Sequence, residues 1–161
     1  MAPGLKLVIC GSAAGTRSAE LGAYYAGPGN QFWGMLYRVG LTPRVLKPAE
    51  FREVLAYAIG LTDIVKTNFG ADSSLRRGDS DPAGLCQKIE RLQPGILVFN
   101  GKRAASAFLG GPVAYGPQPG RDIGATRIYV APSTSGAARG FWDEDLWHLV
   151  AQAVRDADRS R

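Results

Sequence analysis

The stretch LKLVICG, residues 5–11, is a short apolar run that ends in a glycine. A run of this kind, closed by a turn residue, is typical of a strand buried on both faces. Two later runs have the same character, Ile96–Phe99 and Ile128–Ala131. A weaker fourth candidate, Ile59–Val65, is interrupted by two polar residues. The sequence therefore predicts a sheet of four short strands.

Helical patterns separate these runs. The predicted helices are Asn30–Val39, Pro48–Ala58, a helix that begins at Asp81–Pro82, Lys102–Phe108 and Trp142–Ala157. Strands that alternate with helices indicate an α/β protein. We expect a three-layer αβα sandwich with a mostly parallel four-stranded central sheet, formed by a single domain over residues 1–161.

Ligands of such sheets bind beyond the carboxyl ends of the strands. Three predicted loops leave those ends, at residues 11–29, 100–102 and 132–139. The chemistry of the protein is therefore expected in these loops.

Composition narrows the partners and the chemistry. The 161 residues carry a formal net charge of +5, which suits a partner rich in phosphate. Iron–sulfur clusters take about four cysteine ligands and zinc sites are built from cysteine and histidine, but this chain has two cysteines and one histidine. We expect no metal and no cofactor. Cys10 and Cys86 are expected to be buried thiols, and His148 is expected to be structural.

No apolar stretch approaches the roughly 20 residues needed to span a bilayer. The apolar run that follows Lys6 is also too short for a signal peptide. We expect a cytoplasmic protein.

The loop GSAAGTRSAELGAYYAGPGNQFW, residues 11–33, combines glycines with aromatic residues. It begins like a phosphate-binding loop, but it has neither a Gly-x-Gly-x-x-Gly pattern nor a Gly-Lys-Ser/Thr ending. Tyr24 and Tyr25 lie among residues too small for a core strand. An aromatic ring in such a loop can stack on an extruded nucleobase. Alternatively, either tyrosine simply fills the edge of the domain.

Three short motifs stand at the ends of predicted strands. They are YYAGPGNQFW at residues 24–33, Asn-Gly-Lys at 100–102, and PSTSG at 132–136. In order and spacing they resemble the uracil-DNA glycosylase superfamily. The first is similar to motif A of the mismatch-specific uracil/thymine-DNA glycosylases, and more closely to that of the hypoxanthine-DNA glycosylases. The third resembles motif B.

The resemblance implies a monofunctional DNA N-glycosylase. It would flip uracil, and other deaminated bases such as hypoxanthine or xanthine, out of duplex DNA and hydrolyse the N-glycosidic bond. Double-stranded DNA is the implied partner, and a monomer is expected. Two alternatives stay open: a catalytically silent protein that binds damaged or single-stranded DNA, and a protein that binds a nucleotide or phosphosugar.

The catalytic residues are where the chain departs from the family, because Ala13 replaces the asparagine that positions water in the mismatch-specific branch. Asn30 matches an asparagine on which the hypoxanthine branch is thought to rely, and its amide can accept from water and donate to a base carbonyl. Asn30 could instead cap the helix that follows it. Asp63 is the second catalytic candidate, and its alternative is a structural carboxylate in a turn.

The remaining site residues follow from the motifs. For base binding the resemblance implies Tyr25, Gly11, Ser12, Ala13, Asn100 and Ser133. For DNA binding it implies Arg17, Lys102, Thr134, Ser135, Gly136, Ala137 and Arg139, with secondary phosphate contacts from Lys66, Arg76, Arg77 and Arg103. In the family an apolar side chain of motif B wedges into the gap left by the base. Here that place holds alanines, so Arg139 is expected to fill the gap or to grip a phosphate.

The aromatic residues Phe141, Trp142 and Trp147 follow motif B. They are expected to pack the last helix against the core.

Overall fold

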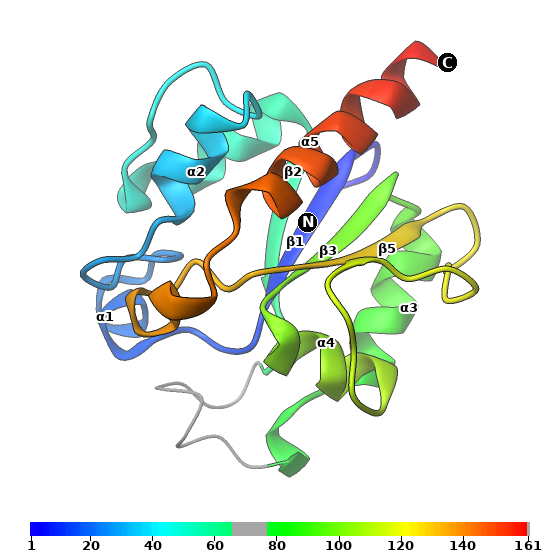
Figure 1. Cartoon of the computed structure of the whole chain (residues 1–161), viewed down its shortest axis with the longest axis horizontal. Coiled ribbons are helices and arrows are strands. Elements are labelled where there is room, and N and C mark those ends of the chain that lie inside the picture. The colour runs from blue at the N-terminus through cyan, green and yellow to red at the C-terminus, as the bar shows by residue number, and fades with distance from the viewer. Residues whose placement is uncertain (66–76, 161) are drawn as a thin grey trace.

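The computed structural model describes residues 1–65 and 77–160, and a five-stranded sheet forms its centre (Figure 1). The strands lie in the order β2-β1-β3-β5-β4. Four run parallel: β1 (Leu7–Gly11), β2 (Ile59–Asp63), β3 (Ile96–Asn100) and β5 (Arg127–Ala131). The fifth, β4 (Gly116–Pro117), pairs antiparallel with β5 at the edge.

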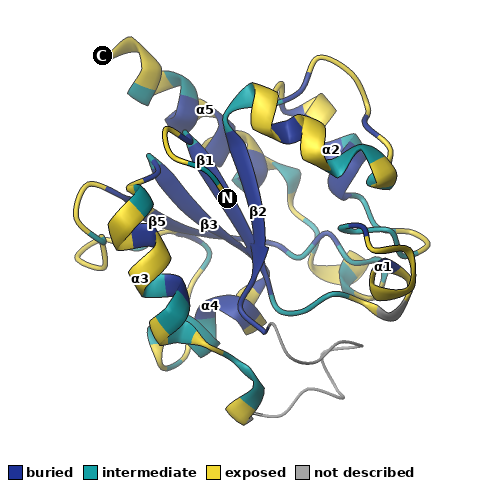
Figure 2. Cartoon of the chain, turned by 180° about the vertical axis from the view of Figure 1, so that it is seen from behind, coloured by how far each residue is buried: buried dark blue, intermediate teal, exposed yellow. Residues whose placement is uncertain are grey.

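The parallel strands are buried on both faces, which explains their continuous apolar sequences (Figure 2). Successive side chains of a strand point to opposite faces. In β1, Leu7 and Ile9 enter one core cluster, whereas Val8 and Cys10 enter the other. One short strand therefore supports two helical layers.

Each core cluster is completed by its own helices. One face of the sheet carries α2 (Phe32–Arg38), the 3₁₀ helix η1 (Pro48–Tyr57) and α5 (Glu144–Arg159). The other face carries α3 (Pro82–Leu92) and α4 (Lys102–Leu109). Among the described residues, the connections contain the short helices α1 (Thr16–Leu21), η3 (Arg77–Asp79) and η4 (Gly136–Phe141). The αβα architecture is confirmed.

Several predicted details are wrong. The sheet has a fifth strand, β4, that was not predicted. It is only two residues long and includes a proline, so the sequence there shows no alternation of apolar and polar residues. Residues 48–57 form a 3₁₀ helix rather than the expected α-helix, and Val54 is the one residue of this helix that is buried. The last helix begins at Glu144 because the Asp143 carboxylate accepts the backbone N–H of Asp145 at 3.0 Å.

The predicted start of α3 is confirmed, since Asp81 caps it by accepting from the Gly84 N–H at 3.0 Å. Cys10 is fully buried as expected, but Cys86 is partly exposed, because it lies beside the apolar stripe of α3 rather than on it. Lys66 and Arg76 lie outside the described residues. Over the described ranges, no helix combines the length and apolar character that crossing a membrane requires.

Candidate active site

The sheet register brings the motifs to one edge. Gly11 at the end of β1 is level with Asp63 at the end of β2, and Asn100 at the end of β3 is level with Ala131 of β5. A cavity of about 410 Å³ opens there, within the range of roughly 300–1,000 Å³ common for small-ligand sites.

Thirteen predicted site residues line this cavity: Gly11, Ser12, Ala13, Tyr25, Asn30, Asn100, Lys102, Arg103, Ser133, Thr134, Ser135, Gly136 and Ala137. They come from chain segments separated by up to about a hundred residues, so their convergence reflects the parallel topology. Three other predicted residues, Asp63, Arg17 and Arg139, lie outside the lining.

At Gly11 the backbone lies close to two neighbouring side chains. A Cβ atom there would lie 2.8 Å from Oδ1 of Asp63 and 3.1 Å from the Tyr25 hydroxyl. Asp63 itself is buried, with 8% of its surface exposed. The carboxylate therefore sits beside the floor of the cavity rather than on its surface, which favours the structural or electrostatic alternative for Asp63.

Tyr25 is held in an unusual conformation. Its backbone φ angle is +52°, a left-handed value that residues other than glycine and asparagine rarely adopt. Its ring stacks on Phe32 with centroids 3.9 Å apart and an interplanar angle of 26°. One face of the ring is thus fixed against the core, while the residue lines the cavity.

The hydroxyl end of Tyr25 is buried without a hydrogen-bond partner that meets normal geometry. Burial raises the pKa of this phenol well above its ordinary value, and the charge of Asp63 raises it further. The nearby Asn100 amide acts in the opposite direction, but its effect is smaller. Tyr25 is therefore a neutral ring at physiological pH.

Asn30 has one fixed and one open end. Its Oδ1 accepts the backbone N–H of Phe32 at 3.0 Å. A backbone N–H can only donate, so this contact fixes which end of the amide is the oxygen. In the described ranges, its Nδ2 has no hydrogen-bond partner, and Asn30 lines the cavity. Asn30 therefore bonds the first residue of α2 although the N-cap of that helix is Gln31, and the amide nitrogen is left to donate.

Asn100 ties two motifs together. Its Nδ2 donates to Oγ1 of Thr134, and its Oδ1 accepts the Thr134 N–H, both at 3.0 Å and both buried. The Thr134 carbonyl in turn accepts the N–H of Gln31, just before α2. Asn100 thus positions the motif B loop against the loop of Asn30.

The motif B loop is held by local bonds as well. Ser133 Oγ accepts the N–H of Ser135, and Ser135 Oγ accepts the N–H of Ala137. The Arg139 guanidinium donates to the carbonyl of Gly29 at 3.4 Å, across to the first loop. Arg139 therefore joins the two loops instead of reaching freely outward.

The predicted DNA-binding cations have different surroundings. The Lys102 ammonium lies over the ring of Tyr115, 4.4 Å from its centroid. Arg17 is exposed on α1 and is 3.9 Å from Glu20, a weak exposed pair. Lys102 and Arg103 line the cavity at the first turn of α4, where backbone N–H groups have no partner within the helix.

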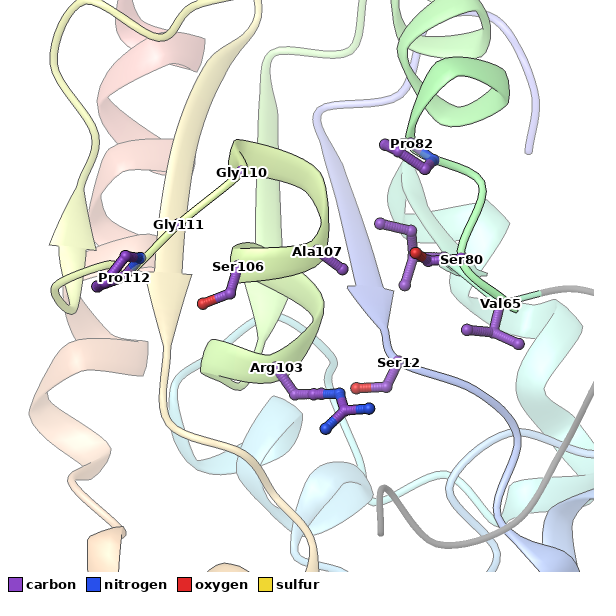
Figure 3. Close-up of a pocket in the computed structure, with 11 residues that line it drawn as sticks. Ser12, Val65, Ser80, Pro82, Arg103, Ser106, Ala107, Gly110, Gly111 and Pro112 are labelled. Carbon is purple, nitrogen blue, oxygen red and sulfur yellow. The ribbon is translucent and has the colours of Figure 1, made fainter. Parts of the chain in front are cut away.

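A larger hollow of about 880 Å³ lies beside α4 and shares only Ser12 and Arg103 with the cavity (Figure 3). Its other walls are Ile64, Val65, Ser80, Pro82 and the end of α4. Val65 is the last residue before the segment that the structure does not describe, and Ser80 follows η3. The hollow contains none of the aromatic or amide groups of the motifs, so the smaller cavity is the candidate site.

Among the cavity residues that the sequence did not predict, Ser18 and Phe141 have side chains that bear on the site. Ser18 is buried in α1, where its Oγ accepts the N–H of Ala26 and so braces the tyrosine loop. Phe141 was expected in the core together with Trp142 and Trp147, but 73% of its surface is exposed and it lines the cavity. Trp147 is fully buried as expected, and its indole N–H donates to the Pro132 carbonyl. The hydrophobic periodicity of the sequence does not distinguish Phe141 from Trp142 and Trp147.

The fold is that of an α/β protein, and its three motifs meet at this cavity on the carboxyl edge of the sheet. Comparison of the sequence with known families identifies the class of protein. A family model described as the uracil DNA glycosylase superfamily matches residues 1–154. The chain belongs to this superfamily and is thereby one of the DNA glycosylases, which act on DNA.

Comparison of folds agrees. The chain is similar to the solution structure of a candidate uracil DNA glycosylase from Methanosarcina acetivorans, with a TM-score of 0.60 and 22% sequence identity. The match covers 94% of this chain and 91% of the other. At this identity the likeness concerns the fold alone.

Proposed function

We propose that the protein removes uracil, and other deaminated bases such as hypoxanthine or xanthine, from duplex DNA. The base would be everted into the 410 Å³ cavity, where its bond to the sugar is hydrolysed. The single observation that carries this proposal is the convergence of Tyr25, Asn30 and Asn100 on one cavity within a superfamily that acts on DNA.

Tyr25 supplies the stacking surface. Its ring is already packed on Phe32, so little side-chain freedom is lost when a base stacks on the other face. Asn30 supplies the donor, because its Nδ2 has no partner within the described ranges and its oxygen is fixed by Phe32. A base carbonyl beside Nδ2 would complete the bonding of the amide.

Charge in the cavity suits the reaction. The water oxygen forms a bond to the sugar carbon and loses a proton, while the glycosidic electron pair leaves with the base nitrogen, which then takes up a proton. Negative charge grows on the base and positive charge on the sugar. The first turn of α4, at Lys102 and Arg103, favours negative charge, and the buried Asp63 carboxylate favours positive charge nearby.

The activity can be tested directly. The protein is incubated with a uracil-containing duplex in the presence of a chelator, and the DNA is then treated with alkali. Strand breaks at the uracil position are expected from a glycosylase. Hypoxanthine and xanthine duplexes of the same sequence define the range of substrates.

Two variants of Asn30 separate capping from catalysis. Asn30→Asp keeps an oxygen for the Phe32 N–H but loses the amide donor, so it should fold with nearly unchanged stability and lose activity by about a hundredfold. Asn30→Ala loses both and should also be less stable by about 1 kcal/mol. Near wild-type excision by Asn30→Asp would exclude the donor role.

One observation favours a second function. Ala13 lines the cavity, and its methyl group cannot hold a water molecule. A protein that binds damaged or single-stranded DNA without cleaving it would need no such water. Retention of the uracil duplex without alkali-labile breaks would support that function over the enzyme.

A further inference from the structure

Phe141 is the most exposed of the large apolar side chains in the described part of the chain, with 73% of its surface open. Single exposed apolar residues are common and need no explanation by themselves. Leu21, Val45 and Tyr37 are such residues, and none of them lines the candidate site. Phe141 differs because it stands at the cavity that would receive the base.

The backbone that carries Phe141 is firmly placed. It ends η4, whose start is capped by Ser135 through the Ala137 N–H. The next residue, Trp142, packs against the core cluster under α5, and its N–H donates to the carbonyl of Arg139. An exposed ring is thus mounted on a segment fixed at both ends.

The loop residues that precede Phe141 at the cavity offer no large apolar side chain. Motif B here offers Gly136, Ala137 and Ala138, and a methyl group is far smaller than the space that a base leaves in the stack. Arg139, the remaining candidate, is bonded to the Gly29 carbonyl. An aromatic side chain has the area to fill such a gap, and phenylalanine is among the residues that wedge into base steps.

We propose that Phe141 stacks on the bases that flank the extruded nucleotide and so occupies the gap in the duplex. This proposal rests on the proposed function, because the gap exists only if a base enters the cavity. Phe141 then determines how well the protein acts on paired DNA. It has no task on a single strand, where no stack must be held open.

The first experiment compares substrates. Phe141→Ala should lower uracil excision from duplex DNA by about tenfold or more while single-stranded excision stays within about twofold, since stacking on one base accounts for effects of this size. Phe141→Trp should restore duplex excision. Tyr37→Ala, which removes an exposed ring on α2 outside the cavity lining, is the matched control and should change neither activity.

The second experiment needs no catalysis. Duplexes that carry a tetrahydrofuran abasic analogue beside 2-aminopurine report binding and local stacking. Phe141→Ala should bind such a duplex at least about fivefold more weakly than wild type and change the 2-aminopurine fluorescence.

The outcomes distinguish the two proposals. Equal loss of single- and double-strand excision in Phe141→Ala, or no loss in either, overturns the role of Phe141 and leaves the glycosylase function intact. Absence of uracil excision by the wild-type protein overturns the proposed function. The stacking role of Phe141 is then tested by binding to the abasic duplex alone. Unchanged affinity and fluorescence of Phe141→Ala on that duplex would overturn the stacking role.

Discussion

At the scale of single residues, Tyr25 combines two features that cost free energy in the folded protein. Its left-handed φ angle of +52° is unfavourable for a tyrosine, and its buried hydroxyl has no hydrogen bond of normal geometry to the residues that the structure describes. Neither feature improves the packing of the ring, which Phe32 provides. Such costs persist where the surrounding structure fixes a residue for another purpose, here the presentation of a ring to the cavity.

Replacing Tyr25 with phenylalanine separates the ring from the hydroxyl. Tyr25→Phe should raise the free energy of unfolding by about 1 kcal/mol, because it removes a buried group without a partner. Excision should stay within about threefold of wild type, since the hydroxyl is covered and the stacking ring remains. Urea denaturation and the duplex assay measure the two effects.

Two further variants complete this comparison. Tyr25→Ala should lose excision by about tenfold or more because the stack is gone. Tyr37→Phe, a change at an exposed tyrosine, should leave stability unchanged. A Tyr25→Phe protein less stable than wild type would mean that the hydroxyl is bonded in solution, contrary to the structure.

At the scale of elements, the site depends on how β3 and the loop after β5 are joined. Asn100 and Thr134 are 34 residues apart, yet two buried hydrogen bonds of 3.0 Å connect them. Asn100 thus has a positioning role in addition to lining the cavity. These two bonds hold the motif B loop, which follows β5, against the carboxyl end of β3.

Asn100→Ala should destabilise the protein by about 2 kcal/mol, because two polar groups of Thr134 lose their buried partner. Excision should fall as well, since the loop that closes the cavity is released. Chemical denaturation and duplex excision, measured where the variant is folded, test both effects.

Gln93→Ala is the matched control. The Gln93 amide also bridges two segments, accepting from the Ala125 N–H and donating to the Glu90 carbonyl, but at the opposite edge of the sheet. It should lose stability without losing excision. An Asn100→Ala protein with full activity would contradict the positioning role.

The elements also show what sequence alone can and cannot predict. The parallel strands and the Asp81 cap are encoded locally, as apolar runs and a capping residue, and they were predicted. The two-residue β4 has no local signal and was missed. The outward turn of Phe141, next to the partly buried Trp142, depends on how η4 meets the first loop, and no periodicity of the sequence indicates it.

The candidate site divides in the same way. Tyr25 and Asn30 could be assigned because residues 24–33 resemble motif A of the superfamily. The occupation of the Asn30 oxygen by Phe32, and the placement of Asp63 behind Gly11, are consequences of packing in three dimensions. They decide which end of a side chain can act, and they required the structure.

At the scale of the whole molecule, the cations that give the net charge of +5 are not all equally free to bind DNA. Several cations are paired within the protein, as in Lys6 with Asp158, Arg38 with Glu144, and Arg44 with Glu50. Lys102, by contrast, lines the cavity and has no ion pair among the described residues. Cations at this edge, more than the total charge, should set the electrostatic part of DNA affinity.

The salt dependence of binding tests this distribution. For a duplex with a tetrahydrofuran abasic site, the logarithm of the association constant should fall linearly with the logarithm of salt concentration, because bound phosphates release counterions. Lys102→Ala should make this slope shallower by about 0.9, the change expected for one lost phosphate contact. Arg91→Ala removes an exposed cation in the last turn of α3, near the opposite edge of the sheet, and should leave the slope unchanged. Equal changes of the slope in both variants would mean that DNA affinity depends on the overall charge and not on the cations at the cavity edge. A change of slope confined to Lys102→Ala would place a phosphate of the DNA backbone at the first turn of α4.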